Sequence, residues 1–176
     1  MRTIRPLPGR LGLILVVLLI ALTTRGVLAA EVATFPLTLK GTTLAIGPAA
    51  DRTTLVAQLQ GALADERPSV FTDERLQYDY IAVPGEGPVA VLVDFDRTGG
   101  WKVIRVEADL QQQNPVAQEV AAWLAQHVGR GRKVGKETVW RYGGMRFCLH
   151  EVRDAGEDSV YGITITRNRA SSKVSR

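Results

Sequence analysis

Cysteine, histidine and aromatic residues are all scarce in this 176-residue chain, which has one cysteine, two histidines and 6% aromatic residues. Because a single cysteine cannot close an internal disulfide, the sequence excludes a small disulfide-stabilised scaffold. The longest apolar run has 12 residues, whereas a transmembrane helix needs about 20, so a polytopic membrane protein is also excluded. The pattern is neither that of a coiled coil nor that of a low-complexity chain. A hydrophobic content of 45% is typical of a globular protein with one domain or two small ones.

The first 30 residues are typical of a secretory signal peptide. They begin with Arg2, Arg5 and Arg10, continue with the apolar run over residues 11–22 and end in small residues. Cleavage after Ala29 or Ala30 would release the mature chain, and no cysteine follows that could carry a lipid. The sequence therefore predicts a periplasmic or secreted protein without stable membrane insertion. The alternative is an uncleaved anchor, which the short apolar run disfavours.

The formal net charge of +4 belongs to this leader. Residues 1–30 carry four arginines and no acid, so residues 31–176 contain 18 basic and 18 acidic residues. The charge is nevertheless divided, with a net −5 over residues 31–109 and a net +5 over residues 110–176. Such halves could attract each other or orient the molecule on a partner. A neutral exported protein without a basic and aromatic platform is not expected to bind nucleic acid.

Hydrophobic patterning predicts an α+β fold with an antiparallel sheet and two main helices. Two short strands over 34–40 and 42–46 precede a helix that Asp51 would cap. Asn114 followed by Pro115 predicts the start of the second helix, and Gly129 predicts its end. Each helix is followed by three β-rich runs joined by glycine-rich turns, at 77–83, 89–95 and 101–108 and again at 137–142, 145–152 and 159–166.

The order helix, strand, strand, strand thus occurs twice within one domain over residues 31–166. A tandem of units at 48–109 and 110–166 would explain it; the alternative is a chance similarity between two α+β halves. Each helix would cover one face of the sheet and leave the other face open. The polar, basic residues 167–176 are expected to form a disordered tail.

This element order resembles the α-β-β-β module of small periplasmic proteins. The module occurs in small outer-membrane assembly lipoproteins and, in tandem, in secreted β-lactamase inhibitor proteins. The resemblance spans residues 48–166 and includes an apolar strand that ends in the turn Phe95-Asp96-Arg97-Thr98-Gly99. It departs from the lipidated cysteine of the first group and from the disulfides of the second, neither of which this chain can provide. What the resemblance implies is a protein-binding surface rather than an enzyme.

Cys148 and His150 are the best candidates for catalysis. They lie two positions apart on a predicted strand, so both share a face with Arg146. A thiolate beside an imidazole would begin a nucleophile–base pair. No orienting group accompanies them, and a free cysteine usually behaves as a small apolar residue, so we expect no catalysis. Together with His127 they lack zinc-ligand spacing, and we expect neither a metal nor another cofactor.

The densest charge cluster comprises Arg130, Arg132, Lys133 and Lys136, separated by glycines. It could bind a phosphate, lipid headgroup or acidic glycan. The alternative is that these cations only complement the C-terminal dipole of the preceding helix.

Two aromatic pairs, Tyr78 with Tyr80 and Trp140 with Tyr142, each share one strand face. On the open face of the sheet they would form a protein interface; under the helices they would be packing. We expect packing for one of the two pairs. Asp94 and Asp96 suggest either a cation site or, as we favour, polar turn formers.

The leading hypothesis is a non-enzymatic binding or accessory module for another envelope protein. Two alternatives stay open: binding of anionic lipid or glycan through the loop Arg130–Lys136, and an envelope thiol enzyme using Cys148 and His150. The sequence does not define the oligomeric state.

Overall fold

The computed structural model describes residues 33–109, 111–152 and 160–168, which form an α+β fold as predicted. The expected signal peptide, most of the turn before the last strand and the tail beyond Asn168 lie outside the described residues. Neither helix of the described part is long and apolar enough to span a membrane.

The elements of the first half follow the predicted order, with one short strand added. They are β1 (Phe35–Leu39), β2 (Thr42–Ile46), α2 (Arg52–Ala62), β3 (Val70–Phe71), β4 (Arg75–Ile81), β5 (Pro88–Phe95) and β6 (Trp101–Asp109). The second half repeats the pattern with α3 (Pro115–His127), β7 (Arg132–Val134), β8 (Glu137–Tyr142), β9 (Met145–Val152) and β10 (Val160–Arg167). Arg167 therefore belongs to the last strand, and the expectation that the tail begins there is wrong.

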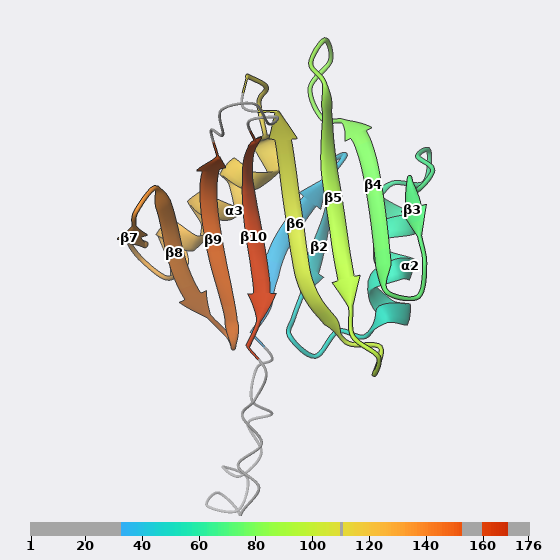
Figure 1. The fold of residues 1–176 in the computed structure, drawn as a ribbon, viewed down its shortest axis with the longest axis horizontal. Helices are drawn as coiled ribbons and strands as arrows, with labels where there is room; N and C mark the ends of the chain where they lie inside the picture. Colours follow the sequence, from blue (N-terminus) through green and yellow to red (C-terminus); the bar gives the residue numbers. More distant parts are fainter. Residues whose placement is uncertain (1–32, 110, 153–159, 169–176) are drawn as a thin grey trace, which may run out of the picture. The chain divides into compact units, whose positions relative to one another are not determined.

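Eight strands form a single antiparallel sheet in the order β3-β4-β5-β6-β10-β9-β8-β7 (Figure 1). The order is symmetric, because the last strand of each half lies at the centre and the first lies at an edge. Along the central seam β6 pairs with β10, from Val160 opposite Asp109 to Thr166 opposite Val103. The two halves, each a helix followed by four strands, thus join through their final strands into one continuous sheet.

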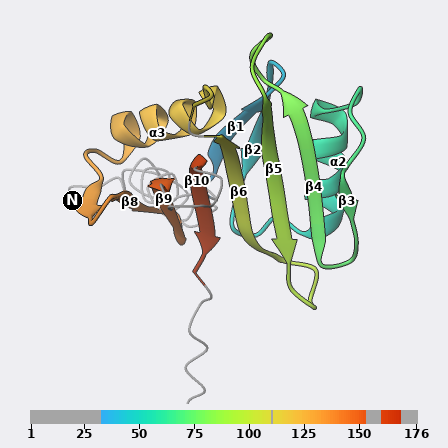
Figure 2. The same ribbon diagram turned by 45° about the horizontal axis from the view of Figure 1, so that its top comes forward.

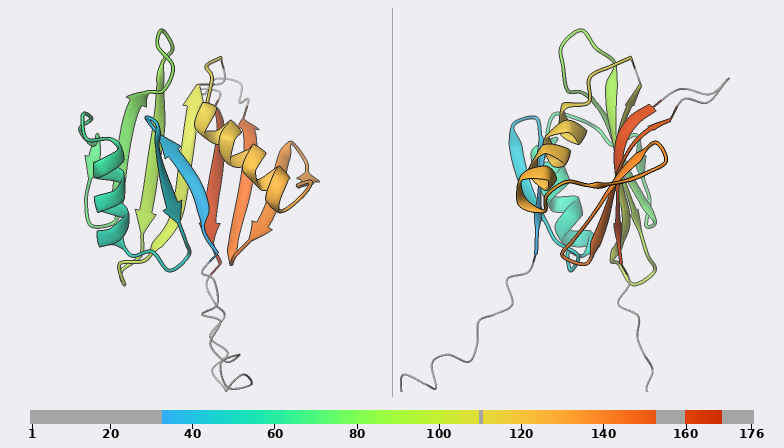
Figure 3. Two further views of the ribbon diagram at one scale, coloured as in Figure 1. Left: turned by 180° about the vertical axis from the view of Figure 1, so that it is seen from behind. Right: turned by 90° about the vertical axis from the view of Figure 1, so that its left-hand side faces the viewer.

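Both helices and the β1–β2 hairpin lie on the same face of this sheet (Figures 2 and 3). The hairpin lies between α2 and α3, and the inward side chains of β1 (Phe35, Leu37 and Leu39) are fully buried. Phe35 packs edge to face against Phe147 of β9, with ring centroids 5.1 Å apart. Because the hairpin fills the space between the helices, a single core runs beneath both halves.

Side-chain caps define where the two helices begin. The Asp51 carboxylate accepts a hydrogen bond from the Thr54 amide at 2.8 Å, and the Asn114 carboxamide accepts one from the Ala117 amide at 3.0 Å. The buried stripe of α3 consists of Val116, Ala117, Val120 and Leu124. Trp123 lies beside this stripe, half-buried against Tyr142.

The aromatic pairs lie on the helix-covered face of the sheet. Tyr78, Tyr80 and Trp140 are only 1%, 2% and 7% exposed, and Tyr142 packs against the core. Strand alternation places each pair on one face, as predicted, but in both halves this is the inner face. The alternative of an exposed interface is therefore excluded for Tyr78, Tyr80 and Trp140, and both pairs, rather than the one expected, pack against the core.

Candidate functional site

The second face of the eight-stranded sheet lies opposite the helices and the β1–β2 hairpin (Figure 3). Within the described ranges no helix or strand lies over it (Figure 3, right). Because side chains alternate along a strand, every second residue of the five strands β4, β5, β6, β10 and β9 belongs to this face. In strand order these residues are Arg75, Gln77, Asp79, Ala90, Leu92, Asp94, Val103, Arg105, Glu107, Gly162, Thr164, Thr166, Arg146, Cys148 and His150. We call this surface the open face.

Ion pairs hold the charged side chains of the open face in place. Asp94 lies between two arginines, with Arg75 Nε at 2.7 Å and Arg105 Nη2 at 3.5 Å. The Asp94 side chain is only 15% exposed. The hydrogen bond from Arg75 to Asp94 raises the pKa of this guanidinium further. Asp94 is thus a cross-strand anchor, and the interpretation as a cation site gains no support here.

His150 and Glu107 form a second pair across the central seam. His150 Nε2 lies 3.7 Å from Glu107 Oε1, and His150 Nδ1 lies 3.3 Å from the carbonyl oxygen of Cys148. The hydrogen bond with His150 lowers the pKa of Glu107, and the same bond raises the pKa of His150. This pair is therefore charged at mildly acidic pH.

The Cys148 thiol and the His150 ring, which the thiol-enzyme alternative would pair, form no hydrogen bond with each other. Both ring nitrogens of His150 have other partners, Glu107 and the backbone. Cys148 is 4% exposed, and burial raises the pKa of its thiol to about 11. A buried, protonated thiol is a poor nucleophile, because the reactive species is the thiolate.

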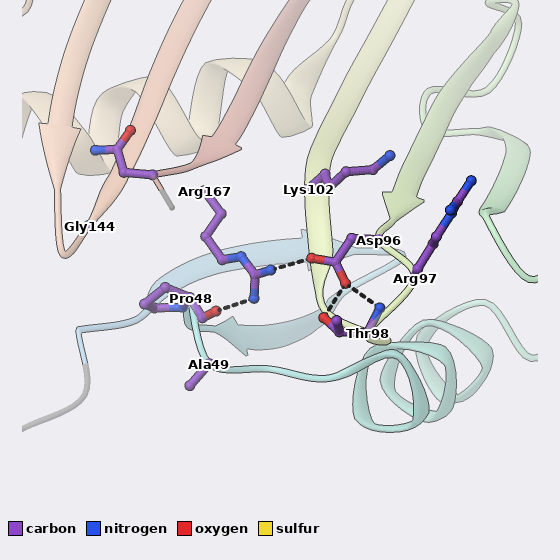
Figure 4. A pocket seen from close by; sticks show the side chains of 9 residues that line it. Pro48, Ala49, Asp96, Arg97, Thr98, Lys102, Gly144 and Arg167 are labelled. Atoms are coloured by element: carbon purple, nitrogen blue, oxygen red, sulfur yellow. Dashed lines mark hydrogen bonds and ion pairs between the residues drawn. The ribbon is translucent and has the colours of Figure 1, made fainter. Parts of the chain in front are cut away.

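Asp96 and Arg167 line an open pocket of about 880 Å³ at one end of the seam (Figure 4). Asp96 Oδ1 accepts hydrogen bonds from the amide and hydroxyl of Thr98 and from the Gly100 amide. Asp96 Oδ2 lies 2.8 Å from Arg167 Nη2, and Arg167 Nη1 donates to the Pro48 carbonyl at 3.2 Å. The polar groups at the centre of this pocket are thus paired with one another, which indicates a structural role.

A smaller pocket of about 440 Å³ lies at the opposite edge of the sheet from α2, where the chain leaves α3. Four arginines line it: Arg130 and Arg132 of the basic loop, Arg141 of β8 and Arg146 of β9. The remaining lining residues are Val128, Val134, Val139 and Trp140. We call this the arginine pocket.

Sequence reasoning identified only half of the arginine pocket. Arg130 and Arg132 belong to the predicted cluster, whereas Lys133 and Lys136 are not among the lining residues. Arg141 and Arg146 were missed, because neither belongs to a cluster of basic residues in the sequence. The β8–β9 register places them directly opposite each other. The sequence signal that could have predicted this pairing is the turn at Gly143 and Gly144. A two-residue hairpin turn pairs the residues that lie at equal distances before and after it, and therefore pairs Arg141 with Arg146.

The described residues contain no group of three side chains arranged to hold a metal ion. His127, the third predicted candidate, stacks on the Trp123 ring with centroids 4.7 Å apart, and its Nδ1 lies 2.9 Å from the Trp123 carbonyl oxygen. Comparisons with protein-family models, with curated proteins and with solved structures gave no match.

Proposed function

We propose that this chain is an exported, non-enzymatic binding or accessory module that binds another envelope protein through its open face. The observation that carries the proposal is the asymmetry of the sheet. One face is covered by both helices and the β1–β2 hairpin, while the other presents ordered side chains to its surroundings.

The centre of the open face is suited to close contact with a partner. It includes two short side chains, Ala90 of β5 and Thr164 of β10, which are partly exposed, so a partner can approach the sheet closely at these positions, whereas Gly162 is buried beneath the Glu107 side chain. Charged side chains around them are already held by ion pairs. Ordered side chains lose little conformational entropy on binding, and this favours affinity.

Export rests on the leader pattern of residues 1–30. Fractionation of the native host and N-terminal sequencing test it directly. A mature chain that begins at Ala30 or Glu31 supports export, and a cytoplasmic chain that retains Met1 contradicts it.

The binding test compares three versions of the tagged full chain in its native host, with mild crosslinking and mass spectrometry of retained proteins. Thr164→Arg places a long cation at the centre of the open face, between Arg105 and Cys148 in register. Ala122→Arg is the matched control, because Ala122 is an exposed position of α3. We expect the wild type and Ala122→Arg to retain one dominant partner that Thr164→Arg loses while it keeps the native circular dichroism spectrum. Equal retention by all three, or no partner for any, would contradict the proposal.

A further inference from the structure

The arginine pocket combines a high positive charge with apolar walls. Its four arginines come from the α3–β7 loop, β7, β8 and β9, and its lining contains no acidic residue. The nearest ion pair in the described chain joins Arg146 Nη2 to Glu137 Oε2 at 3.6 Å. That contact balances one of the four charges, so three guanidinium groups face the pocket without a carboxylate partner among the described residues.

The β8–β9 register adds an independent observation. Arg141 and Arg146 are directly opposed across the two strands. Like charges in this position destabilise an antiparallel pair. A sheet that keeps two opposed arginines beside a concave site is stabilised when an anion occupies that site.

The apolar part of the lining restricts the kind of anion. Val134 is 49% exposed, and Val128 is also among the exposed large apolar residues. Val139 and Trp140 complete the wall, and the Trp140 indole nitrogen donates to the Gly129 carbonyl at 3.0 Å, which fixes the ring. A bare inorganic ion would leave these surfaces in water. A ligand that carries an apolar group next to its charge would cover them.

We infer that the arginine pocket binds a phosphate monoester whose phosphate is attached to an apolar group. A guanidinium presents a planar pair of donors that matches phosphate oxygens, so arginine recognises phosphate through two parallel bonds. A phosphate monoester carries close to two negative charges and three terminal oxygens, which suits Arg130, Arg132 and Arg141 better than a single carboxylate does. The pocket lies at the β7–β8 edge of the sheet and shares Arg146 with the open face, but binding of a phosphate there does not depend on the proposed partner interaction.

The same chemistry occurs in a phospholipid headgroup and in a soluble organophosphate, and two probes distinguish these sources. Phenyl phosphate is the soluble probe, measured by isothermal titration calorimetry against inorganic phosphate. Phosphatidylcholine vesicles that contain phosphatidic acid are the membrane probe, measured by co-sedimentation against pure phosphatidylcholine vesicles.

The matched variants remove the same charge from the same part of the chain. Arg132→Gln with Arg141→Gln removes two lining arginines, whereas Lys133→Gln with Lys136→Gln removes two cations that do not line the pocket. We expect the arginine variant to bind at least about tenfold more weakly, a loss of about 1.4 kcal/mol. The lysine variant should stay within about twofold of the wild type, since screened charges outside the pocket contribute little.

Binding of phenyl phosphate with this pattern supports a soluble ligand, and binding of vesicles alone with this pattern supports a lipid headgroup. Equal losses in the two variants would show a diffuse charge effect and overturn the inference, as would the absence of binding to either probe. Because Arg141 and Arg132 are exposed, the variants should fold; unchanged circular dichroism spectra confirm that a loss of binding is not a loss of structure.

Discussion

The guanidinium group of Arg167 lies 2.8 Å from the carboxylate of Asp96, although 71 positions separate the two residues. Asp96 begins the turn between β5 and β6, and Arg167 is the last residue of β10. A Cβ at Gly100 would lie 2.5 Å from Arg167 Nη2, so a larger residue there would displace the guanidinium group from its present position. The pair therefore connects the β5–β6 turn of the first half to β10, the final strand of the second half.

Removal of this contact should destabilise the fold at this end of the β6–β10 seam. We expect Asp96→Asn and Arg167→Gln each to lower the melting temperature, and the double variant to melt no lower than the worse single variant, because both changes remove one shared interaction. Arg97→Gln, an exposed neighbour in the same turn, is the control and should melt like the wild type. Fully additive losses, measured by thermal unfolding, would show that the two residues act independently.

Asn114 should be among the most sensitive polar positions in the chain. Its carboxamide caps α3 and also donates to the carbonyls of Val106 and Tyr161, at 3.3 and 3.0 Å. The residue is fully buried. Asn114→Ala should lower the free energy of unfolding by about 2–4 kcal/mol, since it removes a cap and leaves buried carbonyls with fewer donors.

Urea unfolding measures this loss, and Asp51→Ala supplies the comparison. Asp51 caps α2 by one bond at an exposed position, so its replacement should have the smaller effect. A loss at Asn114 no larger than that at Asp51 would mean that the two interstrand carbonyls do not depend on the carboxamide.

The thiol of Cys148 should react slowly in the native protein. With its pKa raised to about 11 by burial, about one thiol in 1,000 is ionised at about pH 8, compared with about a quarter for free cysteine. Labelling by an aromatic disulfide reagent should therefore be at least about 100-fold slower than for free cysteine, and should recover after denaturation in urea. Native labelling as fast as free cysteine would restore the thiol-enzyme hypothesis.

The His150–Glu107 pair should make stability depend on pH. The pKa of His150 is raised above 6.5, so its contribution is complete below that value and is lost as the pH rises through the folded pKa. The pKa of Glu107 is lowered below 4.5, so its contribution is complete above that value and is lost as the pH falls through the folded pKa. The pair thus stabilises the fold most between these two values.

The measurement is the melting temperature of the wild type and of Glu107→Gln across this range. The difference should be largest between about pH 4.5 and 6.5 and should shrink as the pH rises through the raised pKa of His150. Glu74→Gln, at an exposed loop position, is the matched control. A difference that does not change with pH would mean that the pair contributes through packing rather than charge.

The opposed arginines of β8 and β9 should weaken the unliganded sheet. Arg141→Gln should raise the free energy of unfolding by about 0.2–1 kcal/mol at low ionic strength, since it removes a like-charge pair. The gain should largely disappear in about 1 M salt, which screens the repulsion. Chemical unfolding at the two salt concentrations checks this, and destabilisation by Arg141→Gln would contradict it.

Local signals in the sequence were sufficient for most of the elements. Asp51 and Asn114 marked both helix starts through their capping chemistry, and strands β8 and β9 have the predicted bounds. The short edge strands were missed. Strand β3 has only two residues, and β7 lies within a basic segment that glycines interrupt, a composition typical of a loop.

Features that depend on distant residues could not be predicted in the same way. Alternation placed Tyr78 and Tyr80 on one face, but which face the helices cover is a property of the whole sheet. The pairing of β6 with β10, and hence the Glu107–His150 pair, arises from register between segments far apart in the chain.

The central seam also has a consequence for how the sheet assembles. Several neighbouring strand pairs are hairpins that close over a few residues and can form within microseconds. The β6–β10 pair must instead close a loop of about 50 residues, which carries a larger entropic penalty and slows folding. The two halves should therefore acquire their own hydrogen bonds first. Backbone amides along β6 and β10 that face the seam should be the last to gain protection from hydrogen exchange during refolding.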